Sequence, residues 1–170
     1  YYDDYSDLLA LWIYSMTKWN ALDILKGDST LELRPNGPTA LGLGFNYKGY
    51  GIGIAIGLPK SNSSKEKYGS TSRFDVQVNV YGKKLGMDGY VQYYKGYYIQ
   101  NPEDFMDWDS DIYPQLPDME VLSIGLSAFY IFNSDKFSYR AAYVRTQVQK
   151  KSAGTFTAGI FGQTDMVTTE

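Results

Sequence analysis

Residues 39–58, TALGLGFNYKGYGIGIAIGL, constrain the fold most, because large apolar residues alternate there with residues that have almost no side chain. A two-residue hairpin turn at Lys48-Gly49 places the large residues opposite one another on one face. The pairs are Tyr47 with Tyr50, Phe45 with Ile52, Leu43 with Ile54, Leu41 with Ile56 and Thr39 with Leu58. A soluble hairpin turns charged side chains to water and large apolar ones to a core. Since the other face carries no charge, we expect the large residues to face lipid.

The length of this hairpin fits the same interpretation. Each arm has about nine residues, which at ~3.3 Å per residue and a ~45° tilt crosses the apolar layer of an outer membrane. Tyr47 and Tyr50 would then lie at the level of the lipid headgroups. The glycines of the other face have two interpretations: they allow the sheet to bend, or they let another backbone approach closely.

Two further hairpins are predicted. In residues 73–98, apolar residues alternate with Arg73, Asp75 and Gln77, and the turn falls at residues 82–86. In residues 121–148, a turn at residues 133–136 would set Phe132 opposite Phe137 and Tyr130 opposite Tyr139. A further strand is expected over residues 155–162. The links at residues 59–72 and 100–119 are long and polar, whereas the hairpin turns are short, which is the layout of outer-membrane barrels.

The N-terminal region allows two interpretations. Residues 8–16 and 30–34 have the alternation of strands, and residues 5–25 also allow an amphipathic helix. We expect an acidic lead over residues 1–7, barrel strands over 8–163, and a tail or the start of a missing segment over 164–170.

The composition of the chain argues against several classes of function. The chain has 17 Tyr and 17 Gly, no Cys and no His, and a net charge of −3. An acidic chain offers no basic field for nucleic acid, so no nucleic-acid partner is expected. Without histidine, the mechanisms of the familiar hydrolytic membrane barrels are excluded, and we expect no enzyme, catalytic residue or cofactor.

Three candidate sites compete with simpler explanations. Asp107, Asp109 and Asp111 have the spacing of a calcium loop within residues 103–118, but Ile112 stands where such a loop needs glycine. We therefore favour a solvated loop and predict no metal site. A pair of carboxylates, Asp75 and Asp88, is better explained by a wet lumen.

The tyrosine doublets at residues 93–94 and 97–98 could stack on sugars. We favour an interfacial girdle for them, because tyrosine is enriched at membrane interfaces.

Two motifs resemble those of a family of Bacteroidota outer-membrane β-barrel proteins catalogued as a domain of unknown function. They are Arg34-Pro35-Asn36 with Pro38-Thr39, ahead of the glycine-rich hairpin, and the link QKKSAG at residues 149–154. The resemblance implies a barrel in the outer membrane with no assigned activity. The candidate strands are odd in number and the sequence ends in Thr-Thr-Glu rather than in an aromatic residue. Either the chain is a fragment whose remaining strands are missing, or a partner supplies the closing edges, and we favour the fragment.

The predicted fold is therefore all-β: an antiparallel up-and-down transmembrane β-barrel, built as a meander of hairpins and incomplete in this chain. The predicted lipid-facing residues are Leu41, Leu43, Phe45, Ile52, Ile54, Ile56, Phe74, Val76, Val78, Val80, Leu122, Ile124 and Leu126. The predicted aromatic girdle is Tyr47, Tyr50, Tyr130, Phe132, Phe137 and Tyr139.

The predicted function is a structural, channel or envelope-assembly role in the bacterial outer membrane. The partners would be membrane lipid or lipopolysaccharide, with other envelope subunits as a further class. The alternative is a soluble lipid-binding β-barrel in which Leu41, Leu43, Phe45, Ile52, Ile54 and Ile56 line an internal cavity.

Overall fold

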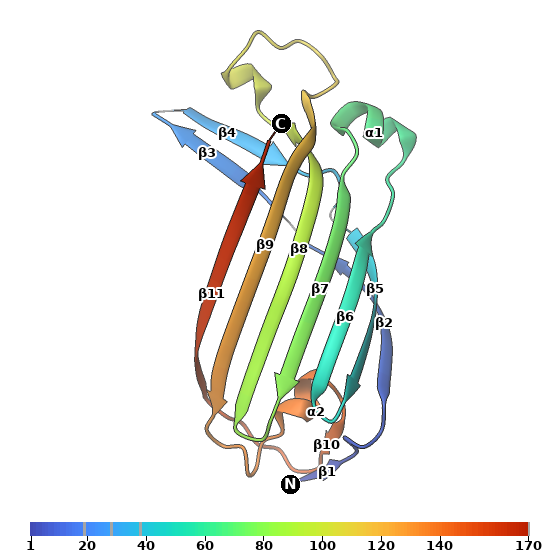
Figure 1. Ribbon diagram of the computed structural model, residues 1–170, viewed down its shortest axis with the longest axis vertical. Coiled ribbons are helices and arrows are strands. Elements are labelled where there is room, and N and C mark those ends of the chain that lie inside the picture. Colours follow the sequence, from blue (N-terminus) through green and yellow to red (C-terminus); the bar gives the residue numbers. More distant parts are fainter. Residues whose placement is uncertain (19, 28, 38, 170) are drawn as a thin grey trace.

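The computed structural model describes residues 1–18, 20–27, 29–37 and 39–169 and is dominated by one long, curved antiparallel sheet (Figure 1). Its strands follow the spatial order β11, β9, β8, β7, β6, β5, β2. They are β2 (Ala10–Thr17), β5 (Thr39–Tyr47), β6 (Tyr50–Gly57), β7 (Ser72–Tyr81), β8 (Leu85–Ile99), β9 (Gln115–Ile131) and β11 (Thr157–Thr168). Within the described residues, the sheet does not close on itself. The all-β, antiparallel prediction is confirmed.

The remaining elements lie at the two ends of this sheet. At one end are the hairpin of β3 (Leu22–Lys26) and β4 (Ser29–Arg34), helix α1 (Asn62–Tyr68) and the short 3-10 helix η1 (Pro102–Asp104). At the other end lie helix α2 (Tyr139–Tyr143) and a two-stranded sheet of β1 (Tyr2–Asp4) and β10 (Gln147–Gln149). None of the helices in the described residues is long and apolar enough to cross a membrane.

The first hairpin has the predicted register. Tyr47 pairs with Tyr50, Phe45 with Ile52, Leu43 with Ile54 and Leu41 with Ile56. Lys48 and Gly49 both have positive φ, 53° and 86°, as a tight two-residue hairpin turn requires. The turn residues therefore fix which side chains share a face.

The second hairpin is also confirmed, with β7 and β8 paired from Ser72 with Lys95 to Tyr81 with Gly86. In the N-terminal region the strand interpretation holds, because β2 covers most of residues 8–16 and β4 covers residues 30–34. Among the described residues of the range 5–25, strands β2 and β3 form in place of the alternative helix.

The third predicted hairpin is wrong. After β9 the chain turns and forms α2, where the Ser138 hydroxyl caps the helix by accepting a hydrogen bond from the amide of Ala141 (2.9 Å). The strand that pairs with β9 on the edge opposite β8 is β11, which runs from residue 157 to residue 168. It therefore extends beyond the predicted strand at 155–162 and crosses the expected boundary at residue 164.

The two link motifs fasten the end elements to the sheet. The Asn36 side chain donates hydrogen bonds to the carbonyls of Ser64 (3.0 Å) and Gly69 (2.7 Å), which holds α1 in place. Gln149 accepts from the Ser138 amide at 2.9 Å, and Lys150 forms an ion pair with Asp3 at 2.9 Å. Pro38, part of the first motif, and Glu170, at the end of the expected tail, lie outside the described residues.

Candidate functional site

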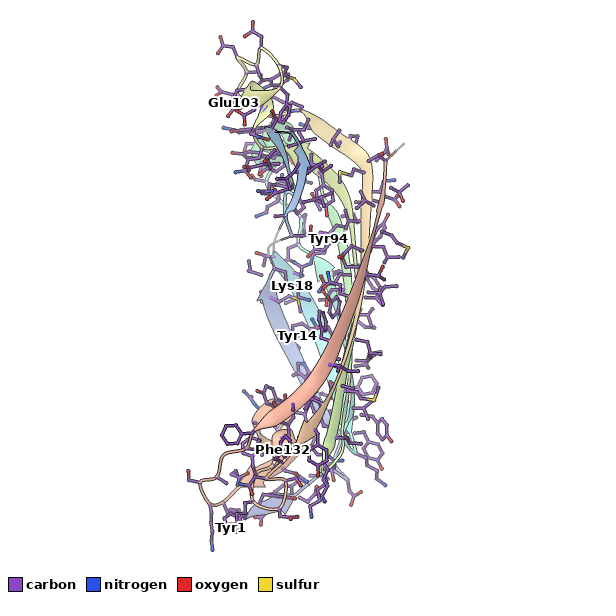
Figure 2. All side chains as sticks on the ribbon, turned by 90° about the vertical axis from the view of Figure 1, so that its left-hand side faces the viewer. Tyr1, Tyr14, Lys18, Tyr94, Glu103 and Phe132 are labelled. Carbon is purple, nitrogen blue, oxygen red and sulfur yellow. The ribbon has the colours of Figure 1, made fainter. Side chains whose placement is uncertain are left out.

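The main sheet has two chemically different faces. All the predicted lipid-facing residues lie on one face, which Figure 2 shows to be the convex one. Ten of the thirteen are exposed, namely Leu41, Leu43, Phe45, Ile54, Ile56, Phe74, Val78, Val80, Ile124 and Leu126, and the other three are half-buried. Leu43, for example, is 66% exposed, whereas Asn46 on the concave face is 0% exposed.

The six predicted girdle residues do not share one environment. Tyr47, Tyr50, Tyr130 and Phe132 are exposed at the end of the sheet where the short turns lie. Tyr139 instead belongs to α2 and packs beneath the concave face, 5.0 Å from Tyr81 and 4.9 Å from Phe129 between ring centroids. The predicted pairing of Tyr130 with Tyr139 on one face is therefore wrong, because α2 interrupts the strand.

Aromatic rings cover glycines on the concave face. Trp12 lies opposite Gly44 and Tyr14 opposite Gly42 in the β2–β5 pairing, and Tyr90 lies opposite Gly125 in the β8–β9 pairing. A Cβ atom on Gly44 would lie 2.5 Å from both Cζ2 and Nε1 of Trp12. Because several atoms of the Trp12 ring lie at similar distances from this Cβ position, the ring lies flat on the strand. The glycines thus make room for aromatic rings of the same sheet, a role that neither of the two interpretations of the sequence included.

A buried ion pair occupies the middle of the concave face. Nζ of Lys18, which follows β2, lies 2.6 Å from Oδ2 of Asp75 on β7, and the Asp75 carboxylate is almost completely buried. Gln77 donates a second hydrogen bond to Asp75 at 3.0 Å. Figure 2 shows Tyr14, Lys18 and Tyr94 projecting into the hollow of the sheet. A buried charge is costly without a partner. The contacts from Lys18 and Gln77 therefore stabilise the ionised Asp75 carboxylate on this face.

Asp75 and Asp88, the two carboxylates of the candidate catalytic pair, do not lie together. Asp75 lies opposite Gln92, whereas Asp88 lies opposite Asn79, four residues further along β7. Asp88 accepts a short hydrogen bond from the hydroxyl of Tyr81 instead. The two carboxylates therefore have separate partners and cannot act together as acid and base.

A cavity of about 610 Å³ lies between the concave face and α2. Its lining combines aromatic rings with amides, one carboxylate and one ammonium group. The residues concerned are Trp12, Lys18, Gln77, Asn79, Tyr81, Asp88, Tyr90, Gln92, Tyr139 and Tyr143. The amide nitrogen of Asn79 is buried there and has no hydrogen-bond partner.

Helix α2 closes this cavity at the end with the short turns. Tyr139 stacks on Tyr143, with ring centroids 4.3 Å apart and planes inclined by 21°. Nε of Arg140 donates a hydrogen bond to the Tyr81 carbonyl at 2.5 Å, at the end of β7. The connection between β9 and β11 is thus anchored to the sheet and covers one end of its concave face.

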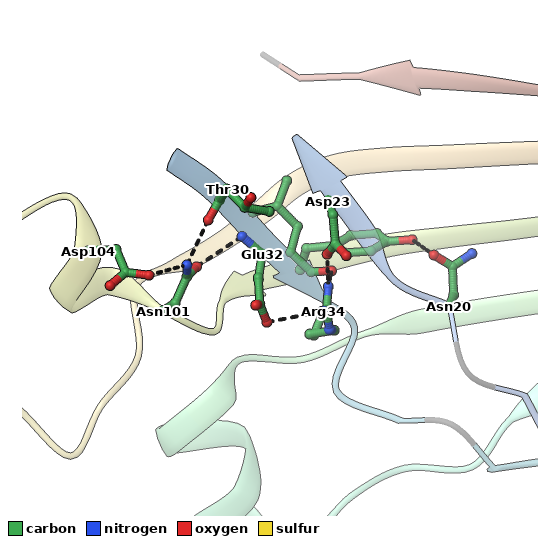
Figure 3. A network of polar contacts seen from close by, with 9 residues as sticks. Asn20, Asp23, Thr30, Glu32, Arg34, Asn101 and Asp104 are labelled. Atoms are coloured by element: carbon green, nitrogen blue, oxygen red, sulfur yellow. Dashed lines mark hydrogen bonds and ion pairs between the residues drawn. The ribbon is translucent and has the colours of Figure 1, made fainter. Parts of the chain in front are cut away.

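The β3–β4 hairpin covers the concave face at the opposite end. Leu33 and Arg34 of β4 pair with Ile99 and Tyr98 of β8, and Leu33 packs in a core that contains Tyr94, Tyr97, Met119 and Val121. Figure 3 shows the polar contacts that hold the hairpin: Asn101 binds the Thr30 carbonyl and the Glu32 amide, and Arg34 binds Asp23 and Glu32.

The tyrosine doublets contribute to this core and its rim. Tyr94 and Tyr97 are 1% and 2% exposed, so they are inaccessible to a soluble sugar. Tyr98 packs against Tyr68 and Tyr113, with ring centroids 5.0 and 5.6 Å away. Tyr94 and Tyr97 therefore neither stack on a sugar nor belong to an interfacial girdle, because the β3–β4 hairpin covers them.

The acidic loop after β8 shows no assembled cation site. Asp107, Asp109 and Asp111 are exposed. Among the described residues, no group of three or more acidic side chains could hold a metal ion.

The residues of this site that sequence reasoning missed are Trp12, Lys18 and Tyr90. The register of β2 against β5 sets Trp12 opposite Gly44, and that of β8 against β9 sets Tyr90 opposite Gly125. No local signal in the sequence gives either register.

Comparison with protein families matches residues 1–170 to the family described as "Domain of unknown function (DUF4421)". The comparisons with curated proteins and with solved structures gave no match. Since the family match spans every residue of the sequence, the chain belongs to the DUF4421 family.

Proposed function

We propose that this chain forms part of the wall of a transmembrane β-barrel in a bacterial outer membrane, as in Bacteroidota, with a structural, channel or envelope-assembly role. The single observation that carries the proposal is the alternation of burial along β5. Its large apolar residues Leu41, Leu43 and Phe45 are exposed on the convex face, while Ala40 and Asn46 are buried on the concave face.

Such a surface is unfavourable in water. Apolar side chains from β2, β5, β6, β7, β8 and β9 form one continuous exposed face. Soluble monomers rarely expose contiguous apolar patches above a few hundred Å². Contact with lipid would avoid this exposure of apolar surface to water. We therefore propose that the thirteen predicted lipid-facing residues contact membrane lipid or lipopolysaccharide. Tyr47, Tyr50, Tyr130 and Phe132 would lie at one lipid interface.

The curvature supports this proposal over the soluble lipid-binding alternative. An internal lipid cavity would need Leu41, Leu43 and Ile54 on the concave face, but they lie on the convex one. The concave face carries the Lys18–Asp75 ion pair and several amides, which suit a hydrated interior.

The proposal also constrains how the sheet closes. Six antiparallel pairings separate β2 from β11, so these two edge strands run in the same direction. Unpaired edges are not tolerated in lipid. An antiparallel closure therefore requires an odd number of additional strands between β11 and β2, from the same protein or a partner subunit, which gives the even total of bacterial barrels.

The chain contains no cysteine, which allows a direct test. Single-cysteine variants at Leu43 and Ile54 on the convex face, and at Gln92 on the concave face, would carry a fluorophore in the protein reconstituted into vesicles. Brominated lipid tails should quench the two convex labels strongly and the Gln92 label weakly. Equal quenching at all three sites, or release of the protein from membranes by alkaline carbonate, would contradict the proposal. Release together with bound lipid would favour the soluble alternative.

A further inference from the structure

We infer that the cavity between the concave face and α2 is a binding site for an uncharged oligosaccharide. The inference goes beyond the proposed function, because it concerns the concave face and does not depend on what covers the convex one. It rests on the orientation of two aromatic rings and on the chemistry of the polar groups between them.

The first observation is a pair of flat aromatic platforms. Trp12 lies flat over Gly44, and Tyr90 lies flat over Gly125, so each ring presents its other face to the cavity. The cross-strand pairings place Trp12, Gly44, Gly53, Gln77, Tyr90 and Gly125 in one transverse row. The apolar face of a sugar ring packs on such a surface, because its axial C–H groups meet the electron-rich ring.

The second observation is the set of hydrogen-bonding groups beside these platforms. Gln77 lies in the same row, and Asn79 and Gln92 lie in the adjacent rows. Amides donate and accept at once, which matches the hydroxyl groups of a sugar. The buried amide nitrogen of Asn79 has no partner in the protein, and a buried donor left unsatisfied is costly. A rotation of the amide toward the cavity would let a ligand hydroxyl accept a hydrogen bond from it.

The charges of the cavity favour an uncharged ligand over an anionic one. Lys18 is paired with Asp75 at 2.6 Å, and the Asp88 carboxylate accepts from the Tyr81 hydroxyl. An anionic ligand would meet the Asp88 carboxylate and would have to compete with Asp75 for Lys18, whereas an uncharged one leaves both contacts intact. The size of about 610 Å³ falls within the range of small-ligand sites.

The test uses isothermal titration calorimetry on the full-length protein in detergent, with maltohexaose and cellohexaose as uncharged probes and hexagalacturonate as the charged comparator. We expect saturable binding of at least one uncharged probe and none of the charged comparator. Trp12→Ala should abolish this binding. Gln77→Leu, which leaves both rings in place, should weaken it at least tenfold.

Val80→Ala provides the matched control, because Val80 lies on the same strand β7, is exposed on the convex face and does not line the cavity. It should bind like the unmodified protein. The inference is overturned if neither uncharged probe binds, if hexagalacturonate binds more tightly, or if Gln77→Leu binds as well as Val80→Ala. Membrane extraction of the same preparations reports separately on the proposed function.

Discussion

The ring of Tyr14 lies directly over Gly42, its cross-strand partner on the neighbouring strand β5. A Cβ atom at Gly42 would come within 2.7 Å of the Tyr14 hydroxyl oxygen. Trp12 has the same relationship to Gly44, two residues further along. The β2–β5 pairing is thus stabilised by rings that shield glycine backbone, an arrangement that depends on the absence of side chains beneath them.

Replacing one of these glycines should therefore disrupt the sheet. Gly44→Val forces its side chain into the Trp12 ring, and overpacking of this kind costs about 1–3 kcal/mol. Gly162→Val is the matched control, because nothing lies within 4 Å of a Cβ at Gly162 on β11. Urea unfolding in detergent, followed by tryptophan fluorescence, should show a lower midpoint for Gly44→Val alone. Similar midpoints for the two variants would mean that the ring can move aside at no cost.

Substitutions at the two residues of the first hairpin turn should change the free energy of unfolding in opposite directions. Gly49 has φ of 86°, and a Cβ there would lie 2.8 Å from Nε of Arg140. Gly49→Ala should lower the free energy of unfolding by about 1–2 kcal/mol, because φ is unfavourable and α2 must shift. Lys48→Asn should raise it by a few tenths of a kcal/mol, since asparagine favours the positive φ of Lys48. The same urea titration measures both, and a stabilising Gly49→Ala would refute the turn geometry.

The sequence predicts the structure of the first hairpin correctly but not that of the third. For the first, Lys48-Gly49 is a local turn signal and the alternation on both sides is clean, so the register follows. For the third, FSYRAAY after the turn alternates like a strand. Its Ser138, however, caps a helix, and Tyr139 and Tyr143 stack one helical turn apart. Local alternation alone does not distinguish these outcomes.

The candidate site was harder to predict because it depends on pairings distant in sequence. Asp75 on the concave face follows from the alternation of β7, but its partner Lys18 lies 57 residues away. Trp12 and Tyr90 acquire their role only when Gly44 and Gly125 are set opposite them. Those registers come from the assembled sheet, since no turn signal links β2 to β5.

The two faces should respond differently to one introduced charge. Ile54→Arg puts a cation on the convex face, which near the membrane midplane costs about 2–4 kcal/mol in a transmembrane barrel. Gln92→Arg, on the concave face, should cost much less, because that face would line the hydrated interior of the proposed barrel. The yield of folded protein after refolding into vesicles compares the two. If Ile54→Arg refolds as well as Gln92→Arg, then Ile54 does not face lipid.

A pH dependence is expected at the β1–β10 sheet, which lies outside the proposed spanning strands. Burial raises the pKa of Asp4, but hydrogen bonds from Ser6 and Gln147, with the nearby Arg140 charge, outweigh it and lower the pKa below its usual value. A lowered folded-state pKa means that the stabilisation is present above the unfolded-state pKa and is lost as pH falls through the folded-state value.

Hydrogen exchange measures this dependence. Between pH 6 and pH 3, amides of residues 146–149 should lose protection relative to those of β8, after correction for intrinsic exchange rates. Asp4→Asn should remove most of the difference, because its amide cannot titrate. Loss of protection that is the same in Asp4→Asn and the unmodified protein would assign the effect to another group.

The ion pair of Lys18 and Asp75 should show strong coupling between its two members. Lys18→Met leaves the Asp75 carboxylate buried without its cation, and breaking a buried pair in this way costs about 3–5 kcal/mol. Adding Asp75→Asn removes the orphaned charge and keeps an oxygen that can accept from Gln77. The double variant should therefore be more stable than Lys18→Met alone, by urea unfolding in detergent. Simple additivity of the two single effects would show that water, and not Lys18, compensates the Asp75 charge.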